Sequence, residues 1–174
     1  QRNVHRRDEL DLLNVIHITG TKGKGSTAAF CDALLQKARP PGAGKIGLYT
    51  SPHMVAARER IRIDGVPISE ADFAKFFWEV WDRLEQNPHR ALETTTLRPV
   101  YYRFMTILAF HVVISQEDSA TLLEVGIGGM YDSTNIFQHQ VVTGVTALGL
   151  DNTAIIVHTL EEVAWHKAGI FKPG

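Results

Sequence analysis

Apolar and polar positions along this chain fall into blocks that predict strands separated by amphipathic helices. Four nearly continuous apolar runs are typical of buried strands: residues 12–18, 45–49, 120–125 and 141–150. Four segments carry apolar side chains at helical spacing: residues 28–38, 69–87, 101–115 and 160–168. Because strands and helices alternate, the pattern favours an α/β fold with a mostly parallel sheet and helices on both faces.

Turn and cap residues support these boundaries. Asp64-Gly65 is typical of a hairpin turn between two short strands. Ser69 with Asp72, and Thr159 with Glu162, have the spacing of capping boxes, which predicts helix starts at both places. Residues 91–99 are rich in threonine and are expected to form a loop.

Composition limits the function classes. The chain has 174 residues, 44% hydrophobic and 21% charged, which excludes wholesale disorder and favours one α/β domain over residues 1–174. A formal net charge of -1 gives no reason to expect nucleic acid or an anionic membrane as a partner. No apolar run approaches the ~18 residues that span a bilayer. The single cysteine, Cys31, is expected to pack in the core within a reducing compartment.

The glycine-rich stretch between the first strand and the first helix is the strongest chemical signal. Gly20, Gly23 and Gly25 let the backbone turn its N–H groups inward, and the following helix N-terminus offers its positive dipole end to an anion. Lys24 would reach the terminal phosphates, and Ser26 would offer its hydroxyl to Mg²⁺. We therefore expect a phosphate-binding loop and an α/β fold of the P-loop type, with a flexible glycine loop as the alternative.

The loop is a variant of the common P-loop. Ile18 stands where that pattern has its first glycine, and Gly25 stands where it has serine or threonine. A conventional P-loop kinase or GTPase is therefore disfavoured.

Polar residues also follow the other three predicted strands. Ser51 comes after the second, Glu124 ends the third, and Asp151-Asn152 follows the fourth. Ligands of such sheets lie beyond the carboxyl ends of the strands, so these residues are expected to share one site with the loop. A carboxylate within an apolar strand needs a partner, and a magnesium ion on nucleotide phosphates would supply one for Glu124. The alternative is that Glu124 caps loop N–H groups or pairs with an arginine.

Six motifs, in this order and spacing, resemble those of the folylpolyglutamate synthase family in the Mur ligase superfamily. They are residues 20–26, 50–53, 59–63, 124–129, 132–136 and 165–171. Tyr131 and the Tyr102-Arg103-Phe104 segment are more similar to the eukaryotic branch than to the bacterial one. The resemblance covers essentially the whole chain.

The resemblance implies an ATP-dependent ligase that adds L-glutamate to the γ-carboxyl of a (tetrahydro)folate through an acyl phosphate. ATP, folate and L-glutamate are then the partners, Mg²⁺ is the cofactor, and K⁺ is an optional further cation. The family also implies a monomer when full-length, located in the cytoplasm, the mitochondrion or both.

The resemblance assigns roles to individual residues. The ATP phosphates would be held by Gly20, Thr21, Lys22, Gly23, Lys24, Gly25, Ser26 and Thr27. Metal would be bound by Ser26, Ser51, Glu124, Asn152 and Lys167. The folate would lie near Ser51, Pro52, His53 and Arg60. Lys24, Glu124 and Lys167 are the implied catalytic residues, and Lys167 matches a lysine that the family carries as a carbamate. Without the resemblance, Lys167 reads as a helix lysine facing solvent.

Two departures from the family pattern matter. The family usually has histidine where this chain has Asn152, which predicts weaker binding of a second metal. The family also places a second domain after the ATPase domain, and this chain ends at Gly174, so we expect a truncated ATPase domain that is insufficient for turnover alone. The competing hypothesis is a truncated, non-catalytic paralogue that binds nucleotide or folate.

Overall fold

The computed structural model describes residues 10, 13–87, 96, 98–116, 119–150 and 159–172. Along the chain the elements are β1 (Val15–Thr19), α2 (Lys24–Ala38), β2 (Ile46–Tyr49), η1 (Ala57–Arg60), β3 (Ile61–Ile63), β4 (Val66–Pro67), α3 (Glu70–Gln86), α4 (Tyr101–Ser115), β5 (Ala120–Glu124), β6 (Val142–Val145) and α5 (Leu160–Ala168).

The described strands form one mixed, mostly parallel sheet in the order β4-β3-β2-β5-β1-β6. β2, β5, β1 and β6 run parallel, while β3 and β4 are antiparallel to their neighbours. The predicted sheet type is therefore confirmed. Parallel pairing brings the carboxyl ends of the four parallel strands to one edge, which is where the sequence places its polar residues.

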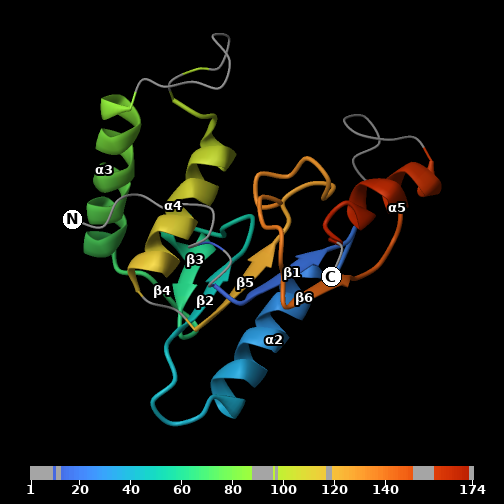
Figure 1. Cartoon of the computed structure of the whole chain (residues 1–174), viewed down its shortest axis with the longest axis horizontal. Coiled ribbons are helices and arrows are strands. Elements are labelled where there is room, and N and C mark those ends of the chain that lie inside the picture. The colour runs from blue at the N-terminus through green and yellow to red at the C-terminus, as the bar shows by residue number, and fades with distance from the viewer. Residues whose placement is uncertain are drawn as a thin grey trace.

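Helices cover both faces of the sheet, as predicted (Figure 1). On one face α2 packs over a small cluster that includes Ile18, Ala28 and Leu122. On the other face α3 and α4 lie side by side over a larger core, to which Phe76 and Leu108 contribute. Cys31 packs against the smaller cluster, as expected. None of the helices in the described ranges is long and apolar enough to cross a bilayer.

Several local predictions are confirmed. The Asp64-Gly65 turn has φ of 49° and 78°, which is typical of a tight hairpin connection. The Ser69 hydroxyl accepts the Asp72 N–H at the start of α3, and Thr159 forms the predicted capping box of α5. His111 of α4 is buried, and its Nε2 lies 2.6 Å from the Glu79 carboxylate of α3.

Three predicted boundaries were wrong. The first strand begins at Val15, because Asn14 has a φ of 46° and ends the preceding turn. The strand predicted over 141–150 stops at Val145, and the chain then turns toward the glycine-rich loop. α2 begins at Lys24, so the second half of that loop forms the first turn of the helix. Most of the predicted 91–99 loop lies outside the described residues.

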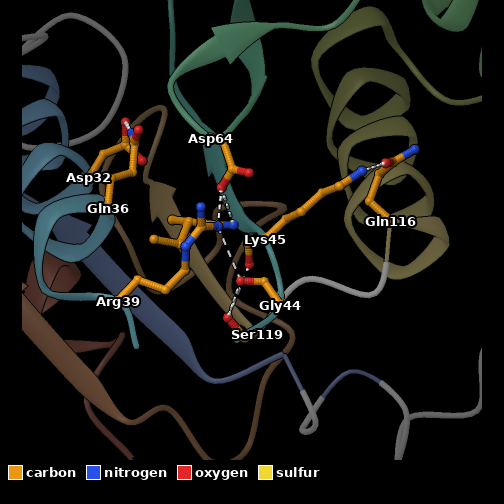
Figure 2. A network of polar contacts seen from close by, with 9 residues as sticks. Asp32, Gln36, Arg39, Gly44, Lys45, Asp64, Gln116 and Ser119 are labelled. Carbon is orange, nitrogen blue, oxygen red and sulfur yellow. Dashed lines mark hydrogen bonds and ion pairs between the residues drawn. The ribbon is translucent and has the colours of Figure 1, made fainter. Parts of the chain in front are cut away.

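A polar network fastens the amino ends of β2 and β5 (Figure 2). The Arg39 guanidinium, at the end of α2, donates to the Asp64 carboxylate in the β3–β4 turn at 2.6 Å. The same carboxylate oxygen accepts the Ile46 N–H, and the Ser119 hydroxyl donates to the Gly44 carbonyl. This network holds the end of the sheet opposite the predicted site, and we read it as structural.

Candidate active site

The phosphate loop lies between β1 and α2, where the sequence predicts it. Gly23 has a φ of 86° and forms the N-cap of α2, so the N–H groups that follow point out of the helix start. The Lys24 ammonium folds back and donates to the Gly20 carbonyl at 3.0 Å. An anion resting on the helix N-terminus would therefore meet free N–H groups with the Lys24 charge beside them.

A second segment, residues 146–149 after β6, clamps this loop from outside. The Thr146 hydroxyl donates to the Lys22 carbonyl at 2.7 Å, and the Thr21 N–H donates to the Ala147 carbonyl at 2.7 Å. A Cβ at Gly20 would lie 1.8 Å from the Thr146 hydroxyl oxygen. Gly20 is thus required by close approach of Thr146 as well as by its φ of 152°. This clamp was not predicted, because the apolar pattern of residues 141–150 predicts a strand.

Glu124 faces the phosphate loop from the carboxyl end of β5. Its side chain is 4% exposed, and both carboxylate oxygens lie 3.5 Å from the position of a Cβ on Gly25. One of these oxygens accepts the Ser51 N–H at 3.0 Å. Burial raises the pKa of Glu124, while the Ser51 N–H and the Lys24 and Arg60 charges act in the opposite direction. Glu124 therefore caps one N–H group of the loop after β2, as the alternative predicted, and its carboxylate also faces the phosphate loop.

This arrangement fits a magnesium ion shared with phosphates. No group of three or more His, Cys, Asp or Glu side chains gathers as a metal site within the described ranges. Mg²⁺ needs no such cage, since it binds through one or two carboxylates plus phosphate oxygens and water. Glu124 would supply the carboxylate of such a site, and the hydroxyl groups of Ser26, in the first turn of α2, and of Ser51 would be further oxygen ligands.

The residues predicted to lie near folate come together beside Glu124. The Arg60 side chain is buried and donates through Nε to His53 Nδ1 at 3.0 Å. It also lies over the Tyr101 ring, 5.5 Å from the centroid. The Glu59 carboxylate accepts the N–H groups of residues 54–56, which lowers its pKa. Two adjacent side chains, Glu59 and Arg60, thereby fix the loop that follows β2.

Lys167 is not a solvent-facing lysine, so the reading based on helix spacing alone was wrong. Its side chain is 6% exposed. α5 docks so closely on the loop after β5 that a Cβ at Gly129 would lie 2.6 Å from the His166 carbonyl oxygen. The Met130 N–H donates to that same carbonyl at 2.7 Å. Asn152, the other predicted ligand of a second metal, lies outside the described residues.

A pocket of about 300 Å³ opens next to these residues. Tyr102 and Arg103 from the start of α4, His166 from α5, and residues of the 127–133 segment line it. Tyr102 packs so tightly on Gly126 that a Cβ there would lie 2.4 Å from the Tyr102 ring. The pocket therefore has an aromatic side close to the carboxyl end of β5.

His17, in the middle of β1, is a buried histidine that the sequence did not mark for a role. It is 0% exposed, and its Nε2 lies 2.8 Å from the Thr134 hydroxyl. Burial, and secondarily the Lys172 charge, lower its pKa from 6.5 to about 4.

This shift predicts a pH dependence of stability. Between pH 6.5 and 4 the unfolded chain binds a proton at His17 that the folded chain does not, so stability falls as the pH is lowered through this window. The loss reaches roughly 3 kcal/mol for a shift of this size. Urea unfolding of the wild type and His17→Gln across this pH range measures it. We expect the free energy of unfolding of the wild type to fall relative to that of His17→Gln as the pH is lowered from 6.5 to 4. The same pH dependence in both proteins would show that the pKa of His17 is not lowered.

The glycine-rich loop joins the end of a parallel strand to a helix N-terminus, and a buried carboxylate faces it. This arrangement is typical of α/β proteins that bind a phosphate group in such a loop.

Comparison with known proteins shows which proteins this chain is similar to. No family model matches the chain. Folylpolyglutamate synthase of Saccharomyces cerevisiae (strain YJM789) is 49% identical over 173 residues, which are 95% of this chain and 31% of that protein. The chain thus spans about a third of the length of the curated relatives that it matches.

Solved structures agree with this result. An FPGS–AMPPCP complex superposes with a TM-score of 0.78 at 34% identity, covering 97% of this chain and 42% of that one. A bifunctional folylpolyglutamate synthase/dihydrofolate synthase with Mn, AMPPNP and L-glutamate bound gives 0.76 at 31% identity, covering 96% and 38%. The chain is therefore related to the folylpolyglutamate synthases, and the resemblance predicted from its motifs is confirmed.

Proposed function

We propose that the protein to which this chain belongs is an ATP-dependent ligase that adds L-glutamate to the γ-carboxyl of a folate. The observation that carries the proposal is the position of Glu124, buried and directed at Gly25 of the phosphate loop. The structural relatives with AMPPCP, or with Mn, AMPPNP and L-glutamate, support a nucleotide and a divalent metal as ligands of this protein.

The residues of this chain would act mainly by positioning and charge. N–H groups at the start of α2 and the Lys24 ammonium would hold the phosphates and balance charge as the γ-phosphoryl group moves to the folate carboxylate. Glu124, Ser26 and Ser51 would hold Mg²⁺, which supplies charge neutralisation at the phosphates. The resulting acyl phosphate makes the carboxyl carbon electrophilic, and the glutamate amine displaces phosphate to leave an amide.

We assign the folate ring system to the pocket beside this site. Its volume of about 300 Å³ suits a flat ring system, and Tyr102 offers an aromatic face. Arg60 is buried and donates to His53, and its charge opposes the rise that burial causes in the pKa of Glu124, so a buried cation near Glu124 would be available for an anionic substrate. Pro52 precedes His53 in the segment that follows β2, and we assign it to the folate side of the site with His53.

Lys167 would contribute after modification. A carbamate on its Nζ would turn a buried cation into an anionic oxygen ligand, which suits the predicted second metal. We propose this role, together with a single nucleotide-binding domain over residues 1–174, on the family resemblance and the burial of Lys167.

The proposal is tested with the complete protein. It is incubated with ATP, Mg²⁺, L-glutamate and tetrahydrofolate, and phosphate release is followed with each substrate omitted in turn. We expect release only with all of them present, and one amide formed per phosphate. Binding of ATP and tetrahydrofolate without release would instead support the non-catalytic paralogue.

A further inference from the structure

A chain of hydrogen bonds leads from His17 in β1 to the loop that follows Glu124. The Thr134 hydroxyl donates to one oxygen of the Asp132 carboxylate at 2.6 Å. The other oxygen of that carboxylate accepts the N–H groups of Gly126 and Ile127, both at 3.1 Å. Asp132 therefore holds the first turn of the 126–132 loop, the segment between Gly126 and Asp132.

The direction of the chain follows from proton count. Thr134 has one hydroxyl hydrogen, which it gives to Asp132, so its oxygen can only accept from His17. His17 Nε2 must then carry the proton, and Nδ1, which is buried and has no hydrogen-bond partner among the described residues, carries none. A neutral imidazole of this tautomer is the form that the core accommodates.

A second side chain of β1 is hydrogen-bonded to the 126–132 loop. The Thr19 hydroxyl donates to the Gly128 carbonyl at 2.7 Å. His17 and Thr19 are two residues apart, so they project from the same face of β1. The 126–132 loop is thus attached to β1 at two points. Its N–H groups bind Asp132, which is linked to His17 through Thr134, and its Gly128 carbonyl accepts the Thr19 hydroxyl.

β1 also ends in the phosphate loop. Ile127, Gly128 and Asp132 line the pocket, so one strand carries the phosphate loop and anchors the pocket wall. We propose that His17 is a positioning residue for the folate pocket: as a fixed Nε2–H donor it orders Thr134 and Asp132, which set the 126–132 loop relative to the phosphate loop. This inference rests on the proposed function in assigning folate to the pocket.

The test compares His17→Leu, which removes the donor at similar size, with His17→Gln, whose amide can place an N–H near the position of Nε2. We expect His17→Leu in the complete protein to raise the KM for tetrahydrofolate about tenfold, as the loss of one buried hydrogen bond would, with the KM for ATP within about twofold of wild type. His17→Gln should restore most of the folate KM. The matched control is His111→Leu. His111 is a buried histidine of α4 that is hydrogen-bonded to Glu79 of α3, and its replacement should leave both KM values unchanged.

Amide hydrogen exchange gives a readout that does not depend on turnover. The Gly126 and Ile127 amides should exchange about tenfold faster in His17→Leu, while the Leu48 amide in β2 keeps its protection. Should the wild type release no folate-dependent phosphate, the proposed function fails, and these two amides still decide the positioning role.

Three results would overturn the inference. The first is a His17→Leu variant with an unchanged KM for tetrahydrofolate and unchanged exchange of the Gly126 and Ile127 amides. The second is a His17→Gln variant whose KM for tetrahydrofolate is as high as that of His17→Leu. If His17→Leu does not fold, Thr134→Val, which removes the hydroxyl at equal volume, takes its place with the same expectations. Failure of both to fold would assign the network to the fold and not to the pocket.

Discussion

Lys24→Met in the complete protein is expected to reduce ATP-dependent glutamylation of folate by on the order of 100-fold or more. The Lys24 ammonium lies at the start of α2, and without phosphates it donates to the Gly20 carbonyl. In the proposed reaction the ammonium group leaves that carbonyl and contacts the phosphoryl group that is transferred. Its loss therefore removes a positive charge that mainly stabilises the transition state. Steady-state phosphate release at saturating ATP measures the effect.

Lys37→Ala is the matched control for this change. Lys37 is an exposed lysine in the last turn of the same helix, far along α2 from the loop. We expect its activity to stay within about twofold of wild type. If Lys24→Met also retains activity at that level, the phosphate loop does not act as proposed.

Glu124→Gln has the second large expected effect. The amide keeps an oxygen for the Ser51 N–H but carries no charge, so the magnesium ion loses its protein carboxylate. Turnover at limiting Mg²⁺ should fall on the order of 100-fold, the upper range for loss of a group that supports a metal. Titrating turnover against Mg²⁺ concentration measures this, and the variant should need more metal.

The variant should not be less stable, which separates a binding defect from a folding defect. Burial raises the pKa of Glu124, so its charged form costs stability at neutral pH and that cost disappears as the pH falls through the raised pKa. Removing the charge is therefore expected to leave the melting temperature equal or higher at pH 7. Asp32→Asn is the control, because Asp32 is also a buried carboxylate with a pKa raised by burial, yet it lies on α2 beside Gln36, away from the site. It should leave the Mg²⁺ dependence unchanged.

The parallel core of the sheet could be predicted because its strands are buried on both faces. Val15 and Leu122 belong to continuous apolar runs, which this environment produces. The same signal failed at the end of β6. Leu148 and Leu150 are apolar but 48% and 61% exposed, so apolar character there does not mark a strand.

The site was predictable only where its chemistry is local. The loop glycines, Lys24 and Glu124 could be predicted as site residues from their residue types and from their positions at the ends of predicted strands. The burial of Lys167 depends on α5 docking against Gly129, a contact between segments far apart in sequence. His17 had one weak signal, a polar side chain inside an apolar run. Its partner Thr134 lies 117 positions away, and sequence pattern alone cannot pair them.

Calorimetric titration of ATP into the complete protein, with and without Mg²⁺, tests the shared site most directly. In the wild type, Mg²⁺ should tighten ATP binding by about tenfold or more, and Glu124→Gln should remove most of that gain while leaving metal-free binding in place. An identical gain from Mg²⁺ in both proteins would show that Glu124 takes no part in holding the metal, and would contradict the account.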